Sequence, residues 1–330
     1  MKIQNKYFLA IESSHDDACI AVLQGYKVIF MFSISQIDVH QKYGGTIPEL
    51  ASREHTKNLA IILDQLKAVF DISKVDYVFY TKEPGLLGSL QLGYLFAKAI
   101  SLVINKPILP INHLIGHFWS AFIEEIEEKE ENINQLDIKF PVLALLVSGG
   151  HSQFFYAKND TDIQIIGKTQ DDALGEIYDK IARRLKLGFP GGPVIDKLNK
   201  QNPDLNVEKY FSIPITDNVY DLSFSGIKTQ VINRINNLEN QGKIVNSAQI
   251  SVDFQKSIIK YLKMKIDNIL KDFKDIKTIS LVGGVAANSE LRNLILSYKN
   301  EGFITKIPPL KYCTDNSAMI GYAGINLLKK

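Results

Sequence analysis

The stretch YFLAIESSHDD, residues 7–17, joins a short apolar run to a polar turn of serine, histidine and aspartate. A second apolar run follows at residues 18–23 and, after a Gln24-Gly25 turn, a third follows at residues 28–34. Such runs between turn residues are typical of strands, so the pattern predicts a strand, a polar turn, a strand and a hairpin to a third strand. The polar turn could hold a phosphate or a magnesium-bound water, although serine and aspartate are also common in ordinary β-turns.

The same pattern recurs in the second half of the chain. The run PVLALLVSGGHS, residues 141–152, is again an apolar segment that ends in a polar turn, and strand-like segments follow at residues 153–157 and 163–168. The repeat predicts two similar α/β lobes, in agreement with a length of 330 residues and a typical domain of about 150 residues. We expect a ligand in a cleft between the two polar turns, where the amides of Gly149-Gly150 could approach phosphate oxygens because no Cβ stands in the way.

Composition excludes few functional classes. The chain has 38 basic and 36 acidic residues, a net charge of +2, and 45% hydrophobic residues. This balance neither requires nor excludes nucleic acid, so such a partner needs a local basic patch. Two cysteines so far apart in sequence, Cys19 and Cys313, do not make a disulfide framework, which favours a reducing compartment. We recognise no signal peptide and no apolar run near the roughly 20 residues that span a bilayer, so we expect a cytoplasmic protein.

The stretch His113-Leu114-Ile115-Gly116-His117 directly follows a predicted strand at residues 108–111. On a helix the two histidines lie on one face, and imidazoles at that spacing can bind one metal ion at the carboxyl end of a strand. The alternative is a pair of surface or capping histidines. Asp315 stands at a predicted N-cap of the last helix. It is also an oxygen ligand that could join the histidines, and two imidazoles with one carboxylate suit iron or zinc.

Further segments bear on a nucleotide site. Asp179 and Asp196 lie on two predicted helices, and each could accept hydrogen bonds from ribose hydroxyls or be an ordinary surface acid. The Phe-Pro-Gly-Gly-Pro segment between them, residues 189–193, is predicted to be a rigid loop that is neither helix nor strand. A strand at residues 278–282 runs into GGVAAN, residues 283–288, where glycines suit the close approach of a base or sugar.

Taken together, these segments resemble one family in order and spacing, nearly end to end. It is the family of tRNA N6-adenosine threonylcarbamoyltransferases, once described as O-sialoglycoprotein endopeptidases. The motifs that carry the resemblance are Ile11-Glu12-Ser13-Ser14, residues 43–55, His113 with His117, Ser148-Gly149-Gly150-His151, the Asp179 helix with its Pro-Gly-Gly-Pro loop, Ser223-Phe224-Ser225-Gly226, residues 283–288 and Cys313-Thr314-Asp315-Asn316.

The resemblance implies an α/β, two-lobed actin/Hsp70-like (ASKHA, duplicated RNase H-like) fold with a nucleotide cleft between the lobes. We place the N-terminal lobe at residues 1–112, with a final helix at about 316–330 that packs back on it, and the C-terminal lobe with helical insertions at residues 113–315. The implied reaction is metal-assisted transfer of threonylcarbamoyl from threonylcarbamoyl-AMP to N6 of the adenosine 3′ of the anticodon (position 37) in tRNAs that read ANN codons.

The resemblance also implies roles for particular residues. The metal ligands would be His113, His117 and Asp315, with one divalent ion per subunit, usually iron in bacterial relatives, with zinc as the alternative. The acyl-adenylate would be bound by Leu146, Val147, Ser148, Gly149, Gly150, Asp179, Gly192, Asp196 and Asn288. His15 departs from the family pattern, because many relatives carry cysteine there, and no residue is assigned as general base.

The implied partners are tRNA, a paralogous dimer partner and an ATPase helper. Candidate tRNA contacts are the basic residues of one predicted helix, which could equally form a solvated face: Lys180, Arg183, Arg184 and Lys186. Two other functions compete with acyl transfer. A metalloprotease would rest on the histidine pair alone, but Leu114 stands where a zincin carries its glutamate base. A non-catalytic nucleotide-binding partner of the same fold would not need an open metal site.

Overall fold

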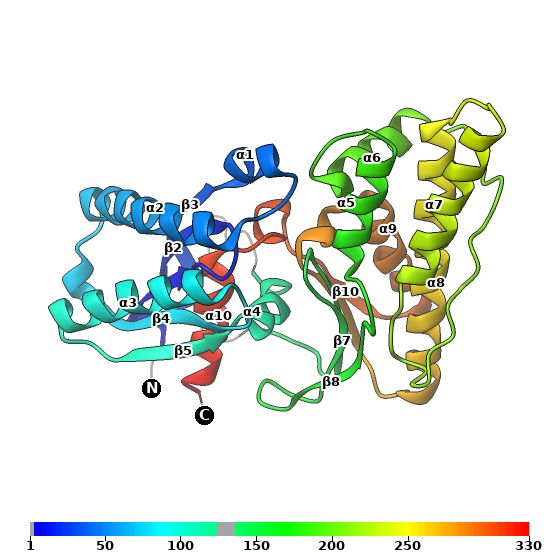
Figure 1. Cartoon of the computed structure of the whole chain (residues 1–330). Coiled ribbons are helices and arrows are strands. Elements are labelled where there is room, and N and C mark those ends of the chain that lie inside the picture. Colours follow the sequence, from blue (N-terminus) through cyan, green and yellow to red (C-terminus); the bar gives the residue numbers. More distant parts are fainter. Residues whose placement is uncertain (1–2, 124–135, 330) are drawn as a thin grey trace. The chain divides into compact units, whose positions relative to one another are not determined.

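The computed structural model describes residues 3–123 and 136–329, which form two compact units (Figure 1). Of the described residues, the first unit contains 3–123, 136–138 and 308–329, and the second contains 139–307. Each unit has its own five-stranded mixed sheet.

The sheet of the first unit has the strand order β3-β2-β1-β4-β5. The first three strands are antiparallel neighbours, and β4 and β5 are added in parallel. The strands are β1 (Tyr7–Glu12), β2 (Asp17–Gln24), β3 (Lys27–Ser35), β4 (Val75–Glu83) and β5 (Ile108–Asn112). The helices are α1 (Ile37–His40), α2 (Pro48–Val69), α3 (Leu87–Ile104), α4 (His113–Ser120) and α10 (Ser317–Leu327).

Strand β1 is central in this sheet and buried on both faces, which explains its nearly continuous apolar sequence. One face packs under α2 and α3, where Leu9, Ile11 and Leu59 belong to the same buried cluster. Helix α10 contacts β1, β2 and β5. Its approach depends on Gly324, where a Cβ would lie 2.5 Å from the ring of Phe79.

The sheet of the second unit has the order β10-β9-β6-β7-β8, which is the order of the first sheet read from the other edge. Its pairings also match, with β6, β7 and β8 antiparallel and β9 and β10 added in parallel. The strands are β6 (Val142–Val147), β7 (Ser152–Ala157), β8 (Ile163–Lys168), β9 (Thr278–Val282) and β10 (Ile304–Lys306). The helices are α5 (Leu174–Arg184), α6 (Gly191–Gln201), α7 (Ser225–Asn240), α8 (Ser247–Asp272) and α9 (Ser289–Ser297). The α/β repeat predicted from the sequence is therefore confirmed.

Several local expectations differ from the structure. Residues 113–123, placed at the start of the C-terminal lobe from the sequence, group with the first unit in the structure, where α4 contacts α10 and β5. The loop predicted at residues 189–193 is wrong in its second half, because α6 begins at Gly191. Its Pro193 lies in the first turn, where backbone N–H groups have no helical partner in any case.

Helix α3 differs from the expectation that no apolar segment is long enough to span a bilayer. By length and composition it is apolar enough to cross a membrane, with a mean hydropathy of 1.5 over 18 residues. From the sequence, no apolar run near the length that spans a bilayer was expected. In the structure α3 packs along one side on α2 and β4, and 28% of its residues are buried. Its other side carries exposed leucine and valine side chains.

Candidate metal centre and nucleotide-binding turns

The histidine pair is placed by the junction between β5 and α4. Asn112 ends the strand, and its Oδ1 accepts hydrogen bonds from the amides of Leu114 and Ile115 at 2.9 and 3.2 Å. This N-cap starts the helix at His113, so His117 lies one turn further on the same face. The two imidazole rings are 4.6 Å apart between centroids and nearly perpendicular, at 81°.

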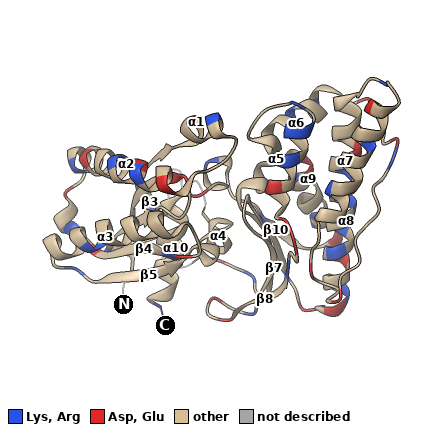
Figure 2. Cartoon of the chain, in the orientation of Figure 1, with Lys and Arg blue, Asp and Glu red and all other residues tan. Residues whose placement is uncertain are grey.

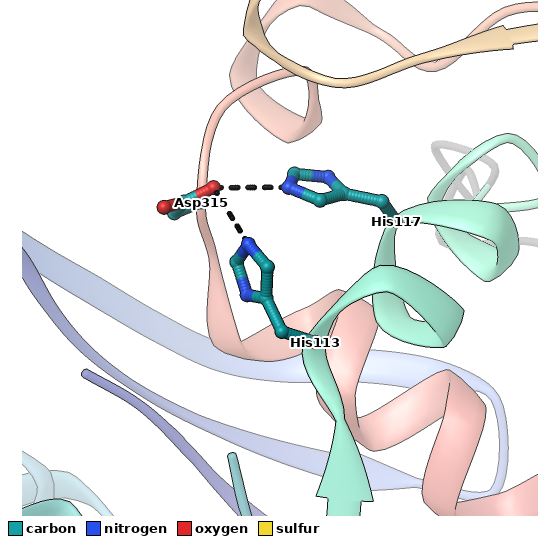
Figure 3. Close-up of side chains that lie close together, drawn as sticks. All are labelled: His113, His117 and Asp315. Carbon is teal, nitrogen blue, oxygen red and sulfur yellow. Dashed lines mark ion pairs between the residues drawn. The ribbon is translucent and has the colours of Figure 1, made fainter. Parts of the chain in front are cut away.

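Asp315 lies beside these histidines, immediately before α10 (Figure 3). Its Oδ1 is 3.0 Å from Nε2 of His117 and 3.6 Å from Nε2 of His113. The candidate ligand atoms of the three residues all lie within 4.8 Å of one another. All three belong to the first unit. The structure thus brings together the metal ligands named from the sequence.

The charges of this group follow from burial and proximity. Burial alone would lower the pKa of His113, but the carboxylates of Asp315 and Glu12 outweigh it and raise the pKa to about 9. Burial lowers the pKa of His117, which favours its neutral form. The pKa of Asp315 is held well below its usual range, because both imidazoles outweigh its own burial. The group therefore combines an ionised carboxylate with an imidazole that is readily neutral, the form that binds metals.

His117 indicates that the donor set fits a cation. Its side chain is fully buried, and within the described part of the chain Nδ1 makes no hydrogen bond. Nε2 faces the carboxylate of Asp315, 3.0 Å from Oδ1. A cation at this position could be bound by Nε2 and by the same carboxylate. Two nitrogen ligands and one oxygen ligand with further positions open suit iron or zinc.

One residue beside this centre was not identified from the sequence. Glu12, the last residue of β1, has its Oε2 3.1 Å from Nδ1 of His113 and is fully buried. Burial alone would raise the pKa of Glu12, but His113 outweighs it and the pKa is lowered. The available signal was a glutamate that directly follows an uninterrupted apolar strand, where a charged side chain is rarely buried without a partner.

The glycine turn of the second unit follows β6. The amide of Ser148 donates to the carbonyl of His151 at 2.8 Å, which closes the turn. Gly149 and Gly150 are exposed, and a Cβ on either would meet no atom within 4 Å. Gly175 of α5 packs underneath, where a Cβ would lie 2.7 Å from the Ser148 carbonyl oxygen. Gly175 therefore packs against one side of the turn, and the side that carries Gly149 and Gly150 is open.

The other predicted adenylate ligands also lie in the second unit, where three of their side chains already have partners. Asp179 accepts from the amide of Gly191 at 2.6 Å. Asp196 Oδ1 accepts from the amide and the hydroxyl of Ser289 at 3.1 and 2.6 Å. Asn288 caps α9 through Oδ1, and its Nδ2 donates to Gln255 at 3.0 Å. These contacts hold the first turns of α6 and α9 in place.

The remaining predicted ligands could act only through their backbone. Leu146 and Val147 are fully buried strand residues. Gly192 lies in the first turn of α6, and a Cβ there would meet no atom within 4 Å.

Basic and acidic residues alternate along the helices of the second unit (Figure 2). Of the four candidate tRNA contacts, Lys180 pairs with Asp172 at 2.9 Å, and Arg184 pairs with Glu239. Arg183 and Lys186 are exposed at the end of α5.

A family model described as tRNA N6-adenosine threonylcarbamoyltransferase matches residues 27–322. A protein of that name from Mesomycoplasma hyopneumoniae (strain 7448) is 53% identical over 329 residues, covering 97% of this chain and 98% of the relative. One from Metamycoplasma arthritidis is 47% identical over 311 residues, covering 94% and 95%.

Solved structures with low sequence identity share the fold. HypF from T. kodakarensis is 12% identical, with a TM-score of 0.65, covering 98% of this chain and 48% of that protein. Component A of the (R)-2-hydroxyglutaryl-CoA dehydratase of Acidaminococcus fermentans is 14% identical, with a TM-score of 0.54, covering 98% and 97%. These neighbours have the actin/Hsp70-like fold, so the fold class predicted from the sequence is confirmed.

Proposed function

The chain belongs to the tRNA N6-adenosine threonylcarbamoyltransferase family, and we propose that it transfers threonylcarbamoyl from threonylcarbamoyl-AMP to N6 of the adenosine 3′ of the anticodon. It is a tRNA-modifying transferase, as its relatives of nearly equal length are. The proposed acceptors are tRNAs that read ANN codons, and the product is N6-threonylcarbamoyladenosine.

The observation that carries the proposal is the group formed by His113, His117 and Asp315, whose ligand atoms lie within 4.8 Å of one another. These residues would hold a divalent ion, iron(II) or zinc(II). Bound there, such an ion would supply Lewis-acid polarisation of the carbamoyl carbonyl. The three side chains leave coordination positions open, which is the property of catalytic sites and not of structural ones.

The second unit would bind the adenylate. We propose that the open amides of Gly149 and Gly150 bind its phosphate, since no side chain covers them. The first turns of α6 and α9, with Asp179, Asp196 and Asn288, would hold the ribose and base. Adenine N6 is a weak nucleophile, so alignment of N6 with the carbonyl is expected to provide much of the rate.

We propose that tRNA contacts the end of α5. Arg183 and Lys186 are exposed there, and basic side chains at such a position can bind phosphates. Replacement of both by glutamine should weaken tRNA binding and reduce its dependence on salt. The matched control is Lys263 on α8, which pairs with Asp267 at 3.0 Å, and its replacement by glutamine should leave tRNA binding unchanged.

The partner proposal rests on an apolar surface formed by α2 and α3, which pack beside each other. Several large apolar side chains on these helices are exposed, namely Ile61 at 48%, Val69 at 72%, Leu87 at 73%, Leu95 at 59%, Leu102 at 67% and Val103 at 81%. Leu95 and Leu102 are seven residues apart and so share one stripe of α3. Surfaces of this kind mark protein interfaces. We propose that a paralogous partner docks here and that an ATPase helper joins the assembly in the cytoplasm.

This interface can be tested apart from catalysis. The double variant Leu95→Asp and Leu102→Asp should abolish co-purification of the paralogous partner. Ile244 in the second unit is exposed at 93%, so Ile244→Asp is a control with the same chemical change and should not affect co-purification. Retention of the partner by the double variant would locate the interface elsewhere.

The activity is tested by incubating the protein with threonylcarbamoyl-AMP, its partners and tRNA, and measuring modified adenosine by mass spectrometry. The reaction should be lost in His113→Ala and His117→Ala. His40→Ala is a matched control, because His40 is also buried but bonds to Gln36, and it should retain activity. Cleavage of a glycoprotein would instead favour the protease, and retained modification in both site variants would contradict metal assistance.

A further inference from the structure

We propose that Glu12 is a positioning residue for the metal centre, which holds the ring of His113 so that Nε2 faces the ion. The inference rests on the proposed metal centre and adds to it a residue from a different part of the sequence. Glu12 ends β1, whereas the ligands come from α4 and the segment before α10.

The carboxylate of Glu12 is held at both oxygens. Its Oε1 accepts from the amide of Ser14 at 2.6 Å, and its Oε2 accepts from the hydroxyl of Thr81 at 2.6 Å. Oε2 also lies 3.1 Å from Nδ1 of His113. The side chain is fully buried. A carboxylate fixed in this way presents its acceptor in one direction only.

This arrangement decides which nitrogen of His113 can bind an ion. An ionised carboxylate accepts but does not donate, so the neutral form of His113, which is the form that binds a metal, keeps its proton on Nδ1, between the ring and Glu12. In that form Nε2, on the other edge of the ring, has its lone pair available and faces Asp315 at 3.6 Å. Carboxylates that accept from the second nitrogen of a metal-bound histidine fix its tautomer and make it a stronger ligand.

The position of Glu12 also excludes it as a fourth ligand of the same ion. Its Oε2 lies at the Nδ1 edge of His113, whereas His117 and Asp315 lie at the Nε2 edge. The imidazole ring therefore separates the Glu12 carboxylate from the ion position. The function that remains for this buried charge is to orient the ligand.

The two histidines differ in the hydrogen-bond partners of their Nδ1 atoms. Nδ1 of His117 is buried and has no hydrogen-bond partner within the described residues, whereas Nδ1 of His113 has Glu12 and, at 3.2 Å, the hydroxyl of Ser14. We therefore expect His113 to be the fixed ligand of the pair. Loss of the Glu12 charge should weaken metal binding through His113 alone.

The test measures cobalt(II) binding by chelator competition and the absorption spectrum of the cobalt-loaded protein. Glu12→Gln keeps the size of the side chain and removes its charge, and should weaken cobalt affinity by roughly 10- to 100-fold. Thr81→Val keeps the carboxylate and removes one hydrogen bond to it, so this variant should lose less cobalt affinity than Glu12→Gln. In the zinc-loaded wild type, nitrogen-15 NMR should show His113 protonated at Nδ1.

Asp253→Asn is the control for general destabilisation. Asp253 is also a fully buried carboxylate with hydrogen bonds, but it pairs with Arg234 in the second unit. This variant should lose stability and keep its cobalt affinity and spectrum. If Glu12→Gln bound cobalt as tightly as wild type, or if zinc bound at Nδ1 of His113, the proposed role of Glu12 would be wrong. Neither result would contradict the metal centre itself. A wild-type protein that binds neither cobalt nor iron would overturn both.

Discussion

Asn316 caps helix α10, whereas its neighbour Asp315 faces the two histidines. The Oδ1 of Asn316 accepts from the amide of Met319 at 3.0 Å, which is the bond that the first turn of a helix requires. Asp315 is released from that role, and its Oδ1 lies 3.0 Å from Nε2 of His117. Asn316 thus provides the helix cap, and its neighbour Asp315 is left available as a candidate metal ligand.

This division predicts different effects for two neighbouring variants. Asp315→Asn removes the charge that a cation requires, so bound iron or zinc should be lost; the metal-free protein should also lose some stability at neutral pH, because the imidazoles lose their charged partner. Asn316→Ala removes the cap and should lower that free energy by about 1 kcal/mol. Metal analysis and denaturant unfolding in the presence of a chelator measure the two effects. Equal metal content in wild type and Asp315→Asn would contradict the ligand assignment.

Two glycines provide a test of the adenylate site. At Gly149 a methyl group meets no atom within 4 Å, so Gly149→Ala should fold normally but hinder the approach of a phosphate to the turn. We expect about tenfold weaker binding of a non-reactive threonylcarbamoyl-AMP analogue, measured by calorimetry, which corresponds to about 1.4 kcal/mol. Gly175→Ala should instead destabilise the fold, because its Cβ would lie 2.7 Å from the Ser148 carbonyl oxygen. Unchanged analogue affinity in Gly149→Ala would place the phosphate elsewhere.

The strands were predictable because they follow a local pattern. Residues 7–11 and 141–147 are apolar runs bounded by polar turns, and β1 and β6 occupy the same place in their sheets. The metal ligands were predictable for a different reason. The i,i+4 spacing of His113 and His117 is local, but Asp315 was joined to them on the chemistry of the donor set and the family resemblance.

What sequence reasoning missed depends on tertiary contacts. Asp315 was placed at an N-cap, but Asn316 takes that position, and both residue types can cap a helix. Glu12 was missed because its partners, Thr81 and His113, are distant in the sequence.

The packing of α10 on the first sheet predicts a large cost for one added methyl group. A Cβ at Gly324 would lie 2.5 Å from the ring of Phe79, which is fully buried and stacked on Phe8 at 5.6 Å. The ring cannot move aside, so Gly324→Ala should lower the free energy of unfolding by about 1–3 kcal/mol. Gly45→Ala is the control, because a Cβ there meets no atom within 4 Å. Equal melting temperatures of the two variants would show that the helix can shift.

The pH dependence of stability should depend in part on Asp172. Partial burial alone would raise the pKa of this carboxyl, but the ammonium groups of Lys228 and Lys180 and the hydroxyl of Ser225 outweigh it and hold the pKa well below its usual range. Because the pKa is lower in the folded chain, the folded state binds the proton more weakly than the unfolded state. The carboxylate therefore stabilises the fold above the unfolded pKa of about 4, and this stability is lost as the pH falls below that value.

Asp172→Asn should accordingly lower the free energy of unfolding at pH 7 by roughly 1–3 kcal/mol, the cost of leaving its partners without the charge. The difference from wild type should shrink as the pH falls below about 4, because there the unfolded wild-type chain binds a proton at this carboxyl that the folded chain resists. Asp162→Asn is the control, because Asp162 pairs with Lys158 at 3.8 Å on the surface, where ion pairs contribute little. Urea unfolding at several pH values measures both variants. If the difference in the free energy of unfolding between wild type and Asp172→Asn stayed constant from neutral to acidic pH, the charge of Asp172 would not be the source of its stabilising effect.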